Sequence, residues 1–159
     1  MKSGSRVLIV SQVPPPHHGS TMMTVTLLEA LGGLGYRCEL LDRRYSRAVS
    51  EVGQVTLAKV LAFPALILRL VLAVVFRRPA RAIVFLTNRR ASFLSDFAML
   101  VALRTFRVPV VNYIHTVGYE SLGERSAFWG ALVRWALKAA DRTVVLGASL
   151  RSDVDWCVQ

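Results

Sequence analysis

The sequence predicts an α/β protein with a mainly parallel, Rossmann-like sheet and helices on both faces. Short runs of β-branched and other apolar residues recur along the chain, and apolar or amphipathic stretches long enough for helices separate them. Strands that alternate with helices in this way pair in parallel through right-handed crossovers. The length of 159 residues and the 53% hydrophobic content also suffice for one domain with a buried core.

The first elements are a strand, a Pro-rich loop and a helix. Val7–Ser11 is a continuous apolar run, which predicts a strand buried on both faces. Ser20 or Thr21 is expected to cap a helix that continues to about Leu34, where glycines end it. Tyr36–Asp42 then predicts a second strand.

The later elements continue the same alternation. Cys38 lies within the second strand, so we expect it to be a buried free thiol. The remaining expected elements are strands over Ala82–Thr87, Val108–His115 and Thr143–Leu146, helices over Phe93–Phe106 and Ala127–Ala140, and a last helix capped by Ser149 or Ser152.

The apolar segment Val55–Phe76 has the length of a membrane-spanning helix, but Lys59 and Arg69 interrupt it. The uncharged stretches that remain are too short to cross roughly 30 Å of hydrocarbon. Two alternatives stay open, namely a crossover helix buried against the sheet and a helix at a membrane surface. Charge favours the second, because no carboxylate but several basic residues occur between Glu51 and Asp96. An anionic leaflet attracts each such residue by about 1 kcal/mol.

Charge and cysteine content restrict the partners and the compartment. The chain carries 20 Lys and Arg against 10 Asp and Glu, a net charge of +10, which suits anionic lipid or phosphorylated substrates. No base-reading module is recognisable, so we expect no nucleic acid partner. Val7–Val10 is too short for a secretory signal, and the cysteine spacing fits no disulfide framework. The expected location is cytoplasmic.

Rossmann-like sheets bind ligands at the carboxyl ends of their strands, so the residues directly after each strand are candidates for binding. After the first strand, the helix start at Gly19 and Ser20 offers backbone N–H groups to a phosphate. The candidates after the second to fourth strands are Arg44, Asn88, Arg89, Arg90, Thr116 and Gly118.

His115 is a candidate for chemistry because it ends the fourth strand pattern, where an imidazole could orient or deprotonate a hydroxyl group. The alternative is a strand-end histidine bonded to a neighbouring loop. His17 and His18 have no third ligand at metal spacing, so no metal site is expected. Ser20 lies outside any Gly-x-Ser-x-Gly elbow, and the first loop has neither a dinucleotide-binding nor a Walker pattern.

These motifs resemble one family. The loop Pro-Pro-Pro-His-x-Gly-Ser-Thr, the helix pattern Leu-Leu-Glu-Ala-Leu-x-x-Leu-Gly-Tyr, the following Leu-Leu-Asp-x-Arg and the later Ala-Asp-Arg-Thr-Val-Val-Leu occur in order. Together they resemble the amino-terminal, acceptor-side domain of GT-B glycosyltransferases of family 4 (group 1), over nearly the whole chain. The family loop commonly has Gly-Gly where this chain has His18-Gly19.

The resemblance implies a hexosyltransferase of cell-envelope polysaccharide synthesis. Such an enzyme moves a sugar, with retention and without a metal or other cofactor, from a nucleotide diphosphate sugar to a glycan or lipid-linked acceptor. By position, His115 would be catalytic, and His18, Gly19 and Ser20 would meet the donor diphosphate. The residues expected to bind the acceptor are Arg44, Asn88, Arg89, Arg90, Thr116 and Gly118.

The resemblance also implies a missing part. A GT-B enzyme has a second Rossmann-like domain that holds the nucleotide sugar, so residues 1–159 are expected to form a single, incomplete domain that is inactive by itself. It would work at the inner face of the cell membrane with that domain or a partner chain. The alternative function is a non-catalytic, basic module that binds membrane surfaces.

Overall fold

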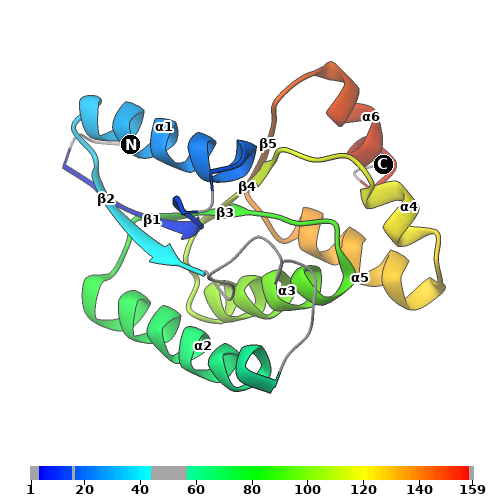
Figure 1. The fold of residues 1–159 in the computed structure, drawn as a ribbon, viewed down its shortest axis with the longest axis horizontal. Helices are drawn as coiled ribbons and strands as arrows, with labels where there is room; N and C mark the ends of the chain where they lie inside the picture. The colour runs from blue at the N-terminus through cyan, green and yellow to red at the C-terminus, as the bar shows by residue number, and fades with distance from the viewer. Residues whose placement is uncertain (1–3, 16, 44–56, 158–159) are drawn as a thin grey trace. The chain divides into compact units, whose positions relative to one another are not determined.

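The computed structural model describes residues 4–15, 17–43 and 57–157, and within them five parallel strands form one sheet in the order β2-β1-β3-β4-β5 (Figure 1). Helices surround the sheet, which confirms the predicted Rossmann-like α/β class. The chain divides into two compact units, Met1–Ala82 and Ile83–Gln159.

The first unit contains the parallel strands β1 (Arg6–Ser11) and β2 (Arg37–Asp42), with Val7 opposite Cys38 and Ser11 opposite Asp42. All of β1 after its first residue is buried, as its continuous apolar run predicts. The helices α1 (Gly19–Gly33) and α2 (Leu57–Arg77) lie on opposite sides of these strands (Figure 1). Cys38 is a free thiol but only half-buried, so the expectation of burial was wrong, because β2 has mostly half-buried side chains.

The start of α1 also differs from the prediction. The N-cap is His18 rather than Ser20 or Thr21, and the helix begins at Gly19. The buried Thr21 hydroxyl accepts a hydrogen bond from His18 N (3.1 Å) and donates one to His18 O (2.9 Å). A threonine inside the first turn therefore reaches back and fixes the extended residue before the helix.

The crossover helix α2 has two distinct apolar stripes. Along one, Leu66, Leu70, Ala73 and Val74 are buried, as expected for a helix packed in the fold. The other stripe is exposed, with relative exposures of 58% at Leu68, 43% at Leu72, 44% at Val75 and 75% at Phe76. Among the described residues, no helix combines the length and the apolar character needed to cross a lipid bilayer.

The strand β3 (Arg81–Phe85) leads into the second unit, where β4 (Val110–Ile114) and β5 (Arg142–Val145) pair in parallel. Every strand overlaps its predicted range. The helices of this unit are α3 (Arg90–Thr105), α4 (Tyr119–Gly123), α5 (Ala127–Lys138) and α6 (Ala148–Asp155).

Two helical details of the second unit differ from expectation. The short α4 was not predicted, because five residues are too few to show a helical period. The N-cap of α6 is Gly147, in an extended conformation, rather than Ser149 or Ser152, so the helix begins one residue before the first of these serines.

Candidate functional site

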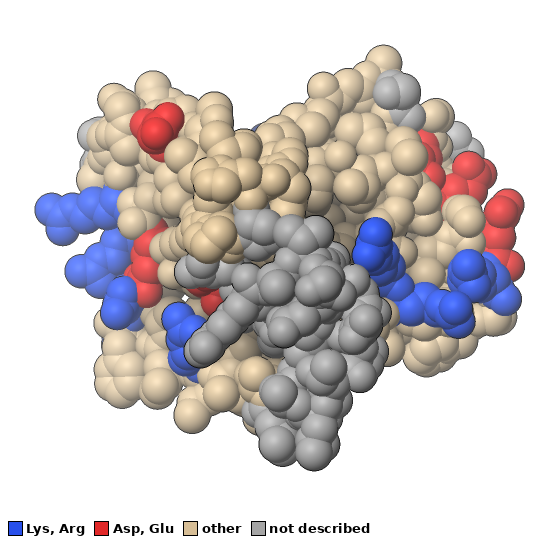
Figure 2. All heavy atoms as spheres, viewed as in Figure 1, with Lys and Arg blue, Asp and Glu red and all other residues tan. Residues whose placement is uncertain are grey.

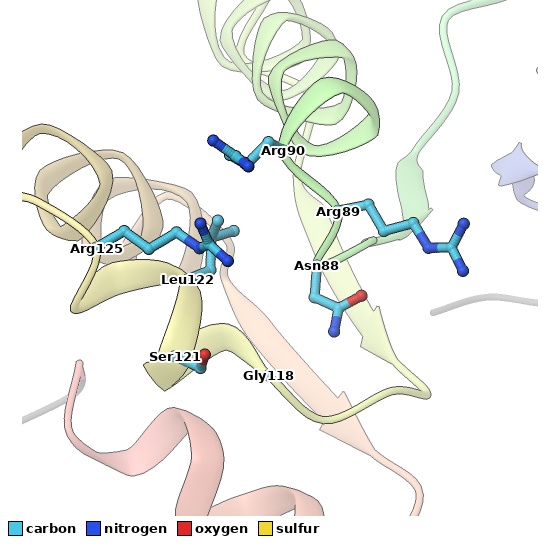
Figure 3. A pocket seen from close by; sticks show the side chains of 7 residues that line it. All are labelled: Asn88, Arg89, Arg90, Gly118, Ser121, Leu122 and Arg125. Atoms are coloured by element: carbon cyan, nitrogen blue, oxygen red, sulfur yellow. The ribbon is translucent and has the colours of Figure 1, made fainter. Parts of the chain in front are cut away.

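The second unit contains an open cleft of about 360 Å³ at the carboxyl ends of β3 and β4 (Figure 3). One wall comes from the loop after β3 and the first turn of α3, and the other from α4 and the residues beside it. The residues that line the cleft are Asn88, Arg89, Arg90, Gly118, Ser121, Leu122 and Arg125.

The structure thus gathers several residues that the sequence pointed to separately. Asn88, Arg89, Arg90 and Gly118 were candidates because they follow predicted strands, and they line one cleft. Ser121, Leu122 and Arg125 were missed because α4 was missed. The only sequence signal for that wall is weak, a glycine followed by Glu120 in the first turn of a short helix.

The wall after β3 is fixed by a buried carboxylate. Asp96 of α3 is fully buried, and its Oδ2 accepts hydrogen bonds from Thr87 N (2.8 Å) and Thr87 Oγ1 (2.7 Å). The next residue, Asn88, donates from Nδ2 to the carbonyl oxygen of Val117 on the opposite wall. Adjacent residues of this loop are therefore held on both sides, Thr87 by Asp96 of α3 and Asn88 by the backbone at Val117.

Gly118 makes that crossing possible. Its φ is +116°, a conformation that side chains rarely adopt, and a Cβ atom added there would lie 2.6 Å from Asn88 Nδ2. The immediate role of Gly118 is therefore to leave room for the Asn88 amide. Its predicted role in acceptor binding stays a prediction.

The wall formed by α4 is held by Asp153 of α6. The Asp153 carboxylate accepts hydrogen bonds from the backbone N–H groups of Gly118 (2.8 Å), Tyr119 (3.0 Å) and Glu120 (3.2 Å). These are N–H groups that a helix start leaves without partners, and a negative charge suits them. Tyr119 and Leu122 of α4 are buried, whereas Ser121 of the same helix and Arg125, which follows its C-cap Glu124, are exposed.

The cleft is positively charged. Figure 3 shows the side chains of Arg90 and Arg125 extending from opposite walls toward the same space, whereas Arg89 points away from them. All three are exposed, and none forms an ion pair with a carboxylate of the described residues. On the face that Figure 2 shows, basic side chains occur in patches with acidic side chains close to them.

His115 and Thr116 directly follow β4 but do not line the cleft. His115 is half-buried, and its ring centroid lies 5.8 Å from that of Phe85. The Thr116 hydroxyl is buried and has no hydrogen-bond partner among the described residues. The catalytic role of His115 and the binding role of Thr116 stay predictions.

In the first unit, the predicted diphosphate loop has its own internal contact. Ser20 Oγ lies 3.0 Å from His18 Nδ1, and His18 and Gly19 are exposed. No described atom lies within 4 Å of a Cβ added at Gly19, so packing does not require a glycine there. Arg44 lies outside the described residues. No group of three or more His, Cys, Asp or Glu side chains in the described ranges could hold a metal ion.

Comparison with known protein families finds no match, and comparison with curated proteins finds none either. Among solved structures, the TIR domains in the structure of the activated Roq1 resistosome directly recognizing the pathogen effector XopQ align with a TM-score of 0.51 and 14% identity, over 98% of this chain and 96% of that one. A conserved protein from Enterococcus faecalis V583 aligns with a TM-score of 0.47 and 12% identity, over 96% of this chain and 98% of that one. The likeness to the TIR domains shows a shared fold alone.

Proposed function

We propose that the chain is the acceptor-side, amino-terminal domain of a GT-B glycosyltransferase of family 4. The cleft in the second unit carries this proposal. It lies at the carboxyl ends of parallel strands, where Rossmann-like sheets bind ligands, and it gathers Asn88, Arg89, Arg90 and Gly118, which the resemblance assigns to the acceptor. The parallel sheet and the motifs of the first loop support the same assignment.

In this proposal the two units have different tasks. The cleft holds the acceptor, and the resemblance assigns to His115, which does not itself line the cleft, the orientation or deprotonation of an acceptor hydroxyl group. The start of α1, which has no acidic residue in its first turn, meets the donor diphosphate through backbone N–H groups near Gly19. A second Rossmann-like domain binds the nucleotide, so residues 1–159 alone bind the acceptor without transferring sugar.

The test measures release of nucleoside diphosphate from UDP- and GDP-sugars, with a membrane-lipid extract as acceptor. The full product of the gene is compared with residues 1–159, and we expect release from the first alone. Two variants test the assigned residues. His115→Ala should lower release at least tenfold, within the range for general acid–base groups. Gly19→Ala should lower release without lowering the unfolding midpoint, because nothing described crowds that position.

His17→Ala is the matched control, because His17 is an exposed histidine without an assigned role. It should leave release unchanged. Absence of any nucleoside diphosphate release by the full gene product would exclude the glycosyltransferase function, and release that His115→Ala leaves unchanged would exclude the role assigned to His115.

A second candidate function, binding to an anionic membrane surface, is favoured by the exposed stripe of α2. Leu68, Leu72, Val75 and Phe76 recur at helical spacing, and the exposed Arg69 and Arg78 flank them. An apolar stripe with basic neighbours suits the interface of a negatively charged leaflet. This surface could act alone or could hold a glycosyltransferase at the inner face of the membrane.

Sedimentation with phosphatidylglycerol and with phosphatidylcholine vesicles at rising salt tests this surface. Binding should require the anionic lipid and weaken as salt screens the charges. The double variant Leu72→Ser/Phe76→Ser should reduce binding, whereas Leu34→Ser, at an exposed leucine just after α1, should not. Binding that is insensitive to lipid charge would exclude the electrostatic part of this function.

A further inference from the structure

The arginines of the cleft stand at an unusual place on their helix. Arg89 is the N-cap of α3, Arg90 is its first residue, and the first turn contains no acidic side chain. The start of a helix carries partial positive charge, so acidic residues or anions are stabilising there and basic residues are not. The local electrostatics of this wall are therefore unfavourable until an anion is present.

Arg125 adds a second positive group from the other wall. Its side chain and that of Arg90 extend toward the same space (Figure 3), and no carboxylate lines the cleft. Glu120 and Glu124 belong to α4 and its C-cap, but neither is a lining residue and neither pairs with these arginines in the described structure. An anionic ligand in the cleft would therefore meet two cationic groups that no described carboxylate neutralises.

The geometry favours a phosphate over a carboxylate. A carboxylate has two oxygens in one plane, so one guanidinium fork occupies it in a bidentate pair. A phosphate or diphosphate has several oxygens in different directions, and two forks that approach from opposite walls can each bind a different set. The exposed Ser121 on the same wall as Arg125 adds a hydroxyl donor.

We propose that the cleft between α3 and α4 binds a phosphate or diphosphate group through Arg90 and Arg125, and that this group belongs to the acceptor. The assignment of this group to the acceptor rests on the proposed function, whereas the binding of a phosphate or diphosphate by the cleft does not. A phosphorylated sugar and a sugar linked to polyprenyl diphosphate both carry this group together with a hydroxyl group that can accept the transferred sugar, so the acceptor is phosphate-bearing in either case. A neutral glycan would not use these two arginines.

Calorimetric titration of the 159-residue chain with inorganic pyrophosphate at low ionic strength tests the phosphate site. Arg90→Gln and Arg125→Gln should each weaken binding about tenfold, as expected for loss of one charge-assisted interaction. Arg142→Gln is the matched control, because Arg142 is an exposed arginine at the amino end of β5, whereas the cleft lies at the carboxyl ends of β3 and β4 and Arg142 does not line it. It should change the affinity less than twofold once the lower net charge is allowed for.

Two further measurements separate the alternatives. Arg125→Lys keeps the charge but not the guanidinium fork, so its affinity for pyrophosphate should lie between those of the parent and of Arg125→Gln. Unfolding midpoints show that each variant is folded.

Equal affinity for malonate and pyrophosphate, or equal losses of affinity in Arg90→Gln, Arg125→Gln and Arg142→Gln, would overturn the phosphate site. Titration with glucose 1-phosphate and with polyprenyl diphosphate in neutral vesicles shows which source is preferred. Pyrophosphate binding by the 159-residue chain, with no sugar transfer by the full product of the gene, would refute the proposed function and leave the phosphate site intact.

Discussion

At the scale of single residues, the cleft depends on a contact between Asn88 and Gly118. The Asn88 amide occupies the space that a side chain at position 118 would fill, and it bonds to the backbone of the facing wall. The sequence could identify both residues as candidates from their places after strands. The sequence could not show that Asn88 and Gly118 are in contact, because the residues around each one carry no information about such a distant part of the chain.

Gly118→Ala should destabilise the protein by about 2 kcal/mol, because a left-handed backbone conformation is costly for a residue with a Cβ atom and because that atom would displace Asn88. Urea unfolding of the parent and variant measures the change. The double variant Asn88→Ala/Gly118→Ala removes the displaced amide but keeps the backbone strain. In the Asn88→Ala background, Gly118→Ala should therefore still lower the free energy of unfolding, but by less than it does in the parent. An equal loss in both backgrounds would contradict the contact between Asn88 and Gly118.

At the scale of elements, the sequence predicted the strands better than the helix ends. Most of the strands are short apolar runs between polar or loop residues, so their pattern locates them; β2, with Arg37, Glu39 and Asp42, is the exception. Helix ends depend on individual hydrogen bonds, such as that from His18 N to Thr21 Oγ1, which shifted the start of α1. The short α4 depends on Asp153, a residue from another helix, and a long-range cap of this kind leaves no local signal.

Asp153→Ala should loosen α4, because three backbone N–H groups would lose their shared acceptor. We expect a loss of about 2 kcal/mol in the free energy of unfolding, as for other charged caps of partly exposed helices. Hydrogen exchange at residues 118–120 should accelerate more than exchange in α5.

Arg151→Ala is the control for this change, because it removes a side chain of α6 that forms an exposed pair with Asp155. Such a pair contributes at most about 0.5 kcal/mol. Equal effects of the two substitutions would show that α4 does not depend on the carboxylate.

At the scale of the whole molecule, the two thiols give the fold a predictable response to alkaline pH. Burial raises the pKa of the Cys157 thiol from 9.0 to about 11, and it also raises the pKa values of Cys38 and Tyr113. The folded state therefore holds these protons more tightly than the unfolded state. The contribution of the protonated Cys157 thiol to the free energy of unfolding is fully present below pH 9, and it is lost as the pH rises through the pKa of the folded state.

The unfolding free energy of the parent should therefore fall by up to about 3 kcal/mol through Cys157 alone as the pH rises through the range between the two pKa values. Cys157→Ala removes the titrating group, so its stability should fall less steeply over the same range, although its stability at neutral pH is lower because a buried side chain is lost. Cys38→Ala, at a half-buried position, should change the slope less. Identical slopes for the parent and Cys157→Ala would contradict this assignment.

The bond between Asp153 and α4 also has a consequence for biosynthesis. Residue 153 follows Gly118 by 35 positions, so a ribosome releases the arginines of the cleft well before it releases the carboxylate that fixes their wall. A nascent chain that has emerged only to a point before position 153 would present all five strands but not yet the carboxylate that fixes its anion-binding wall. The capacity to bind phosphate would then appear late and abruptly during translation, which makes it a usable reporter of when this half of the protein completes its folding.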